Sequence, residues 1–272
     1  MGTSERRDAA MRVNYSTTAN LEVRQSLLSH VTGVEGTHVH DLVGRIELGS
    51  MILEVGCGNG TWLAQAAKRG EAVGLDLSWP MLQGARRTVP DAPLVGGDAQ
   101  QLPVRDGSVD VVLALWMLYH VPDKPAALAE AARVLRPGGR LIAATNAASE
   151  QGPHSDIIRR SLTDALGRPV GQWLEPLDFN EENGADILRE QFADVDRYRW
   201  EVRFEVPCPE PLVAYLDSGR TPIEAELGDD LPWDDILARA DELTRTHLAA
   251  HGTLRFTRTG AGFVARQPAD HQ

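Results

Sequence analysis

The sequence lacks the features that mark membrane, exported and disulfide-rich proteins. Its longest apolar stretch, Val109 to Tyr119, is interrupted by Asp110 and is too short to span a bilayer. The first ten residues, MGTSERRDAA, contain no apolar signal core, so nothing in them directs export. Two cysteines, Cys57 and Cys208, are too few for a disulfide framework or a zinc site. These absences predict a cytoplasmic protein with no membrane partner.

Basic residues are also in short supply. The chain has 27 Lys and Arg against 39 Asp and Glu, a net charge of −12. Residues 178–250 hold 19 acidic and 7 basic side chains, which accounts for the whole imbalance. Such a chain repels phosphate polymers, so we expect no nucleic-acid partner. We interpret the acidic stretch as solvated surface, and a pocket for a cationic or amine-bearing substrate is the alternative.

Two common catalytic motifs and a metal-ligand cluster are missing as well. No Gly-x-Ser-x-Gly elbow and no P-loop lysine occur, which argues against hydrolase and nucleoside-triphosphatase chemistry. His38 and His40 lie one residue apart, but Asp41 is the only further ligand type beside them. We therefore predict no metal site.

What the chain does contain is a strand–helix alternation between residues 51 and 146, typical of a parallel sheet built from βαβ units. The predicted strands are Met51–Val55, Ala72–Leu75, Leu94–Gly96, Val109–Leu115 and Arg140–Ala144. The predicted helices are Thr61–Arg69, Pro80–Thr88 and Pro125–Leu135, the last ending in a turn at Arg136–Gly139.

The segments before residue 51 and after residue 146 do not show this strand–helix alternation. Residues 14–31 predict a helix before the core, and helical patterns follow near 156–166, 182–191, 209–217 and 233–250. Val195–Val206 and Thr253–Ala265 predict two long strands, consistent with an antiparallel hairpin at the edge of the sheet. The aromatic side chains of this region are interpreted mainly as core, with a pocket wall as the alternative: Trp173, Phe179, Tyr198, Trp200, Phe204, Tyr215 and Trp233.

The predicted fold is therefore α/β: a Rossmann-like, doubly wound, mostly parallel sheet with an antiparallel edge hairpin and helical lid insertions. We divide the chain into an N-terminal helical cap at 1–47, a cofactor-binding core at 48–146, and a segment at 147–272 that completes the sheet. Within that last segment, residues 147–178 and 207–250 are the predicted lid insertions.

The strongest local signal is Leu53–Gly60, with the sequence LEVGCGNG, placed directly after a strand and before a helix. Glycines there let a ligand approach bare backbone, as in dinucleotide-binding folds and methyltransferases. Glu54 favours the second group, since dehydrogenases usually have an apolar residue at this point. Its carboxylate can accept hydrogen bonds from the amino group of an amino-acid moiety.

Two further acids follow the next strands. Asp76, 22 residues beyond Glu54, is positioned to accept from both hydroxyls of an adenosine ribose, and a helix N-cap or exposed loop acid is the alternative. Asp98 follows the third strand and can hydrogen-bond an adenine amino group. Three carboxylates at successive strand ends predict a cofactor that carries both an amino acid and an adenosine.

In combination these motifs resemble the class I S-adenosylmethionine-dependent methyltransferases, especially the small-molecule group of ubiquinone-biosynthesis type. The resemblance covers about residues 48–146 and follows the motifs in this order: LEVGCGNG, GLDLS, GDAQQLPVRDGSVDVVLA, YHVPD and RVLRPGG. It implies S-adenosylmethionine as the cofactor and methyl transfer as the reaction.

The resemblance also implies roles for individual residues. It places Glu54, Gly56 and Gly58 at the methionine end, Asp76 at the ribose, and Asp98 with Ala99 at the adenine. Three further positions predicted to contact the cofactor are Asn59, Leu77 and Leu115. Trp116 would lie beside the cofactor and face the acceptor, at a position where family members commonly have smaller residues.

Methyl transfer requires alignment, exclusion of water and, for some acceptors, removal of a proton. His120 follows the fourth strand of the core and is the candidate base, with an exposed or helix-capping histidine as the alternative. Trp116 and Tyr15 are candidates for cation–π contact with the sulfonium. Tyr15 is also a candidate lid residue, with surface packing as the alternative.

The function predicted is therefore S-adenosylmethionine-dependent methylation of a small molecule at oxygen or nitrogen, with natural-product tailoring as one setting. A nicotinamide-dependent oxidoreductase and a non-catalytic S-adenosylmethionine-binding protein are the alternatives. The identity of the acceptor and the oligomeric state stay open.

Overall fold

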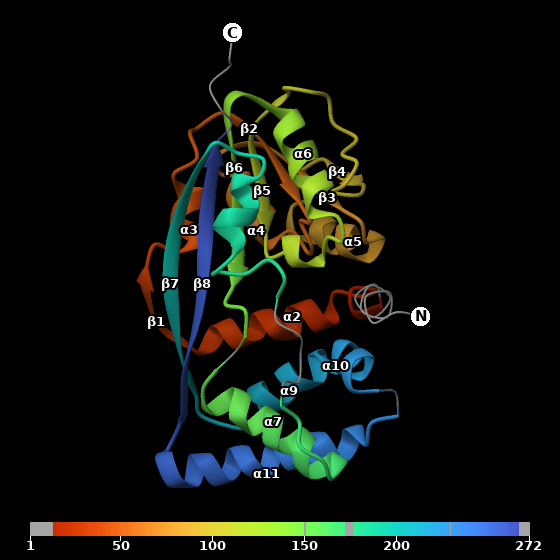
Figure 1. Ribbon diagram of the computed structural model, residues 1–272, viewed down its shortest axis with the longest axis vertical. Coiled ribbons are helices and arrows are strands. Elements are labelled where there is room, and N and C mark those ends of the chain that lie inside the picture. Colours follow the sequence, from red (N-terminus) through yellow and green to blue (C-terminus); the bar gives the residue numbers. More distant parts are fainter. Residues whose placement is uncertain (1–12, 150, 172–176, 229, 267–272) are drawn as a thin grey trace. The chain divides into compact units, whose positions relative to one another are not determined.

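The computed structural model describes residues 13–149, 151–171, 177–228 and 230–266 (Figure 1). By contacts the chain divides into two compact units. The core unit comprises Glu35–Ala148, Leu177–Trp200 and Thr259–Gln272. The second unit comprises Met1–Val34, Ser149–Pro176 and Glu201–Arg258.

One eight-stranded sheet has the strand order β1-β7-β8-β6-β5-β2-β3-β4. Its strands are β1 (Val31–Gly36), β2 (Ser50–Val55), β3 (Gly70–Asp76), β4 (Leu94–Gly96), β5 (Val109–Leu115), β6 (Leu135–Asn146), β7 (Asp194–Val206) and β8 (Leu254–Arg266). Strands β2 to β6 pair in parallel, and β8 pairs with β6 in the antiparallel sense. The mostly parallel α/β fold expected from the sequence is confirmed.

The helices also divide between the units. Those of the core unit are α3 (Val39–Gly44), α4 (Thr61–Ala66), α5 (Trp79–Thr88), α6 (Lys124–Val134), α8 (Gly184–Arg189) and the 3-10 turn η2 (Leu118–His120). Those of the second unit are α2 (Ala19–Ser26), the 3-10 turn η1 (Leu27–His30), α7 (Pro153–Leu166), α9 (Glu210–Ser218), α10 (Arg220–Leu227) and α11 (Trp233–His251).

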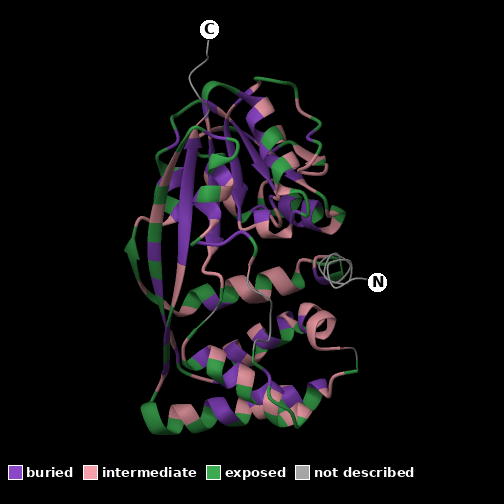
Figure 2. Cartoon of the chain, in the orientation of Figure 1, coloured by how far each residue is buried: buried purple, intermediate pink, exposed green. Residues whose placement is uncertain are grey.

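The apolar core follows directly from the central strands. Six of the seven residues of β5 are buried, because helices cover a parallel sheet on both faces and leave its central strands little contact with water (Figure 2). The helix starts are marked in the sequence. Ser78 caps α5 by accepting from the Met81 amide, and Asp123 caps α6 by accepting from the Ala126 amide at 3.0 Å. These caps fix where α5 and α6 begin.

Two details of the predicted sheet are wrong. The pair β7 and β8 does not form the edge, because β1 lies outside β7. Residues Arg136–Gly139 are not a turn before a strand but a bulged part of β6. The β5 partners jump from Val109↔Leu135 to Val111↔Arg140, and Gly138 takes a φ of +77°.

Some elements were not predicted from the sequence, and others begin or end at residues that differ from the predicted ones. The predicted helix at 14–31 begins only at Ala19, and its last residues form η1. Strand β1 and helices α3 and α10 were not predicted, since each is short. Of the aromatic side chains interpreted as core, Phe179, Trp200, Phe204 and Trp233 are buried, Tyr198 and Tyr215 are half-buried, and Trp173 lies outside the described residues.

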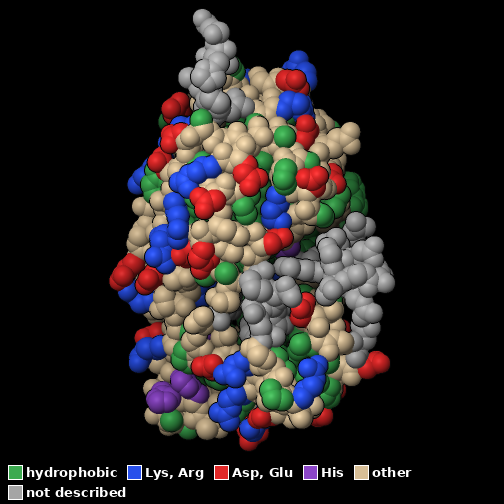
Figure 3. All heavy atoms as spheres, in the orientation of Figure 1, with side chains coloured by type: hydrophobic (Ala, Val, Ile, Leu, Met, Phe, Trp, Pro, Cys, Tyr) green, Lys and Arg blue, Asp and Glu red, His purple; other side chains and the backbone are tan. Residues whose placement is uncertain are grey.

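Within the second unit, α11 packs against α7 and α9, and α2 packs against α9. The Arg24 guanidinium of α2 donates to the Ser218 carbonyl at 2.6 Å and thereby ties α2 to the end of α9. On the face shown in Figure 3, acidic and basic side chains are interspersed. Across the described ranges, no helix is both long enough and apolar enough to cross a membrane. The lid role of 147–178 and 207–250 stays a prediction.

Candidate cofactor and acceptor site

The glycine turn joins β2 to α4 and is built from left-handed backbone. Gly56, Gly58 and Gly60 have φ values of +70°, +54° and +83°. The amides of Gly56 and Cys57 donate to the Leu75 carbonyl of β3 at 2.7 and 2.9 Å. A Cβ on Gly56 would lie 2.8 Å from the Met117 Cβ. Only glycine satisfies both requirements at this position, the positive φ and the close approach.

Asp76, the last residue of β3, is hydrogen-bonded to the glycine turn. Its Oδ2 accepts from the Gly58 amide and its Oδ1 from the Ser78 amide, both at 2.8 Å. Burial raises the pKa of Asp76, and these backbone hydrogen bonds act in the opposite direction. Ser78 is the residue that caps α5, so the alternative that Asp76 caps this helix is wrong. Each carboxylate oxygen keeps a lone pair for a further donor.

Glu54 lies in β2, two residues before the turn, and is 2% exposed. Its Oε2 is buried without a hydrogen-bond partner. Burial raises the pKa of Glu54 well above its usual range, and the negative charge of Asp76 raises it further. A buried carboxylate oxygen without a donor fits the ammonium group of an amino-acid ligand, which would supply both the hydrogen bond and the opposite charge.

This burial gives a testable pH dependence. Because the folded pKa of Glu54 lies above its unfolded value, the ligand-free fold binds more protons than the unfolded chain, and stability falls as pH rises through that interval. We expect Glu54→Gln to raise the melting temperature of the ligand-free protein at pH 8 by a few degrees, on the scale of about 2–4 °C per kcal/mol. The variant should bind S-adenosylmethionine about tenfold or more weakly, since a charged hydrogen bond contributes about 1.5–3 kcal/mol.

The control is Glu71→Gln, which removes an exposed carboxylate from β3. It should change neither the melting temperature nor the binding constant. Thermal melts from pH 5 to pH 8 and calorimetric titrations measure both effects. A Glu54→Gln protein that is less stable than the wild type at pH 8 would contradict the assignment of a desolvated carboxylate.

Asp98, beyond the end of β4, is held by Gln100, a residue that was not selected from the sequence. The Gln100 side-chain amide donates to both carboxylate oxygens of Asp98 at 3.0 Å, and the Gln100 backbone amide donates at 2.9 Å. The side-chain oxygen of Gln100 accepts from the Asp123 amide at 3.1 Å. Gln100 therefore orients Asp98, and a pattern of acids at strand ends contains no signal for it.

The remaining residues predicted to contact the cofactor have different surroundings. Leu77 is 68% exposed after β3, whereas Leu115 is 5% exposed at the end of β5. Ala99 is partly buried against the main apolar core. The Asn59 side chain accepts from the Thr61 hydroxyl at 2.8 Å. Their contacts with the cofactor stay a prediction, and the exposure of Leu77 leaves an apolar surface beside Asp76 that a ligand can cover.

Trp116 follows β5 directly and has a φ of +54°, rare for a bulky side chain. Its amide donates to the Ala144 carbonyl at 2.8 Å, and its indole nitrogen donates to the Asn146 Oδ1 at 3.0 Å. The neighbouring β6 therefore fixes both its backbone and its ring. Backbone strain of this kind is concentrated at binding and catalytic sites.

The two candidate catalytic residues lie in different units. His120 is half-buried at the end of η2 in the core unit, and its ring lies edge-on to Tyr119 at 4.4 Å between centroids. Tyr15 belongs to the second unit, where Arg24 lies over its ring at 5.9 Å and donates to its hydroxyl at 3.4 Å. The role of each in catalysis stays a prediction.

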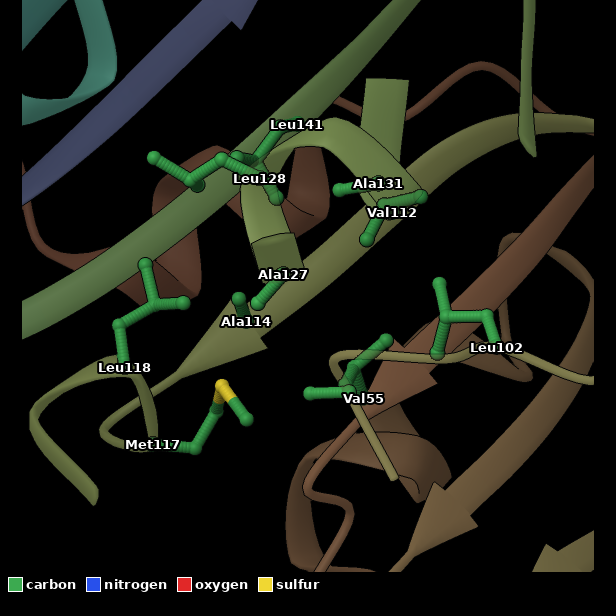
Figure 4. Close-up of a pocket in the computed structure, with 11 residues that line it drawn as sticks. Val55, Leu102, Val112, Ala114, Met117, Leu118, Ala127, Leu128, Ala131 and Leu141 are labelled. Carbon is green, nitrogen blue, oxygen red and sulfur yellow. The ribbon is translucent and has the colours of Figure 1, made fainter. Parts of the chain in front are cut away.

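A small cavity of about 10 Å³ lies in the core unit, between α6 and strands β2, β5 and β6 (Figure 4). Its lining is apolar throughout, with Val55, Met117 and Leu118 nearest the ends of β2 and β5. It has room for about one water molecule and offers it no polar partner, so we interpret it as a packing gap. In the part of the chain that is described, no three His, Cys, Asp or Glu side chains are placed to hold a metal ion.

The turn, the two strand-end acids beside it and the parallel sheet together define an α/β cofactor-binding protein. Residues 53–143 match a family described as "Methyltransferase domain". This region, about a third of the chain, is a class I S-adenosylmethionine-dependent methyltransferase domain, and the cofactor that the family implies is S-adenosylmethionine.

Individual relatives agree with this domain assignment. The demethylmenaquinone methyltransferase of Lactiplantibacillus plantarum is 34% identical over 153 residues, which cover 51% of this chain and 59% of that protein. An uncharacterized 37.1 kDa protein from a transposon of Streptomyces fradiae is 46% identical over 101 residues, 35% of this chain and 29% of that protein. The chain thus spans 29% to 59% of the length of these two curated relatives.

A solved structure extends the likeness over more of the chain. The structure of a candidate type II methyltransferase from Anaeromyxobacter dehalogenans is similar with a TM-score of 0.60 and 25% sequence identity. The alignment covers 84% of this chain and 94% of that one. The fold shared with that protein therefore reaches beyond residues 53–143.

Proposed function

We propose that the chain transfers a methyl group from S-adenosylmethionine to the oxygen or nitrogen of a small molecule. The observation that carries this proposal is the pair of acids beside the glycine turn. Asp76 is fixed by the Gly58 amide at 2.8 Å, and Glu54 holds a buried carboxylate oxygen without a partner. A relative whose name gives demethylmenaquinone as substrate supports a small-molecule acceptor.

In this proposal each of the three acids near the strand ends has a distinct task. Glu54 accepts from the cofactor's ammonium group, Asp76 accepts from the ribose hydroxyls, and Asp98 is directed at the adenine amino group by Gln100. When bound, S-adenosylmethionine supplies an electrophilic methyl group on a positively charged sulfur. The protein then has to hold donor and acceptor in line and exclude water. The ends of β2 and β5 are the rigid elements beside the residues assigned to the methionine end, and they can position both molecules.

Two alternatives are distinguished by direct measurement. A nicotinamide-dependent oxidoreductase would bind NAD, and Glu54 disfavours that reading because a carboxylate at this point faces a pyrophosphate unfavourably. A non-catalytic binding protein would bind S-adenosylmethionine without turnover. Calorimetric titration with both cofactors separates the first alternative. Incubation with methyl-labelled S-adenosylmethionine and a set of phenols and amines separates the second, since only an enzyme transfers the label.

The ribose assignment gives a further quantitative test. Asp76→Ala should weaken S-adenosylmethionine binding about 30-fold or more. Two hydroxyls that lose a charged acceptor cost about 2–4 kcal/mol, and about 1.4 kcal/mol corresponds to tenfold. Asp91→Ala, at an exposed position before β4, is the matched control and should bind as the wild type does. Calorimetry measures both constants.

Because Asp76 also accepts from the Gly58 amide, Asp76→Ala can loosen the turn itself. Asp76→Asn removes the charge with nearly the same shape and keeps one acceptor oxygen, so one of the two backbone hydrogen bonds of Asp76 can persist. It should fall between the wild type and Asp76→Ala. A change of less than threefold in Asp76→Ala would mean that this carboxylate only stabilises the turn.

A further inference from the structure

Four aromatic rings of the core unit meet beside the end of β5, and we name them the aromatic cluster: His38, Trp62, Trp116 and Trp200. Trp62 and Trp116 stack at 5.6 Å between centroids with 29° between their planes. Trp200 meets Trp116 edge-on at 6.2 Å and meets His38 edge-on at 5.0 Å. Each ring comes from a different part of the fold, so no local sequence pattern indicates that they meet.

Trp200, on β7, forms the rigid back of the cluster and is 4% exposed. Two glycines of the neighbouring β8 make room for its ring. A Cβ on Gly260 would lie 2.8 Å from the Trp200 indole nitrogen, and one on Gly262 would lie 3.1 Å from its Cζ3. The indole therefore lies directly against the backbone of β8 and has little freedom to move.

Trp62 and Trp116 are more exposed to solvent than Trp200. Trp62 and Trp116 are both half-buried, although large aromatic side chains are stabilised by full burial. The strained backbone of Trp116 and the hydrogen bond from its indole to Asn146 hold its ring in this partly exposed place. Strain and exposure together are not explained by packing of the core, and they are typical of a ligand site.

The cluster adjoins the cofactor turn through chain connectivity and packing. Trp62 is the second residue of α4, the helix into which the glycine turn leads. Met117, the neighbour of Trp116, packs against Gly56 within the turn. An acceptor resting on Trp62 would therefore lie beside the residues assigned to the methionine end of the cofactor.

The charge of the cluster indicates which kind of acceptor it suits. Burial lowers the pKa of His38, so its imidazole is neutral at neutral pH. Asp41 accepts from the His38 amide and completes the cap of α3. The rings lie 5.0 to 6.4 Å apart between centroids, which leaves no cage between them for an ammonium group. Because Trp62 and Trp116 stack on each other, what the cluster offers is the outer face of the half-buried Trp62 indole, which suits a flat ring.

We propose that Trp62, backed by the stacked ring of Trp116, forms a stacking platform for an uncharged, planar aromatic acceptor that carries the hydroxyl or amino group to be methylated. Trp200 and His38 pack against Trp116 and hold its ring in place. This inference rests on the proposed function, because it names the substrate class for the same site.

The experiment uses S-adenosylhomocysteine, which has no methyl group to transfer, and three probes of known shape and charge. The probes are 2-naphthol (flat and neutral), cyclohexanol (neutral but not flat) and tetramethylammonium (a cation). Calorimetry and ligand-observed NMR measure their binding to the full chain with and without S-adenosylhomocysteine. We expect 2-naphthol to bind and the other two to bind at least tenfold more weakly.

Three variants locate the effect. Trp62→Leu should weaken 2-naphthol binding about tenfold, and Trp62→Phe should restore most of it, because stacking requires a flat ring. Trp79→Leu is the matched control, since Trp79 is 68% exposed at the start of α5 and lies outside the cluster. It should bind 2-naphthol as the wild type does. Binding of S-adenosylhomocysteine by Trp62→Leu within threefold of the wild-type value shows that the variant is folded.

The outcomes separate the two proposals. Tetramethylammonium binding that depends on Trp62, or 2-naphthol binding that is equal in wild type and Trp62→Leu, would overturn the stacking platform while leaving methyl transfer in place. Failure of the wild-type protein to bind S-adenosylhomocysteine would overturn the proposed function. Selective binding of 2-naphthol that is lost in Trp62→Leu and regained in Trp62→Phe supports the platform.

Discussion

Gly56→Val should abolish S-adenosylmethionine binding, with a loss of more than 100-fold in affinity. Gly56 has a φ of +70°, and an added Cβ would lie 2.8 Å from the Met117 Cβ. A β-branched residue cannot take this backbone conformation without strain, so the turn must move. Because the Gly58 amide that fixes Asp76 belongs to the same turn, movement also displaces the ribose acceptor. A loss of 100-fold corresponds to about 2.7 kcal/mol.

The strain itself needs a matched control, and Gly138 provides one. Its φ is +77°, close to that of Gly56, but a Cβ there would meet nothing within 4 Å. Gly138→Val should therefore carry a similar backbone cost without disturbing the turn. We expect its melting temperature to fall while its affinity for S-adenosylmethionine stays within threefold of wild type. Undiminished affinity in a folded Gly56→Val protein would refute the assignment of the cofactor to this turn.

The fold from β2 to β6 could be predicted because each element there leaves a local signal. Strand β5 is an apolar run interrupted only by Asp110, and Asp123 and Pro125 mark the start of α6 within a few residues. Strand β1 was missed since its burial follows no apolar alternation, and its place in the sheet comes from pairing with the distant β7. Pairing between segments more than 150 residues apart leaves no local pattern to find.

The candidate site likewise contains residues that could be predicted from the sequence and residues that could not. Glu54 and Asp76 could be selected because they stand at fixed distances from a glycine turn. The aromatic cluster could not, since His38, Trp62 and Trp200 come from three separate elements. In the sequence, His38 was considered as a metal ligand because it stands close to His40 and Asp41. In the fold its Nδ1 accepts from the His40 amide and its ring packs on tryptophans. Packing partners are decided by the tertiary structure.

Replacing His120 tests whether its imidazole removes a proton from the acceptor. His120→Ala should lower turnover at least 100-fold on an acceptor with a hydroxyl or protonated amine, because a positioned base contributes about 10²–10⁴ in rate. Affinity for S-adenosylmethionine should change little, since the residue lies in η2 and not in the glycine turn. Steady-state kinetics on an acceptor found by label transfer measure the first quantity, and calorimetry measures the second.

The neighbouring ring supplies the control for this prediction. Tyr119 lies edge-on to His120 at 4.4 Å, so a change in η2 that merely disturbs packing should be reproduced at Tyr119. Tyr119→Leu removes the ring that packs on His120 while keeping the imidazole, and it should lower turnover at least tenfold less than His120→Ala does. A fully active His120→Ala enzyme would leave alignment on the platform and the turn as the whole mechanism.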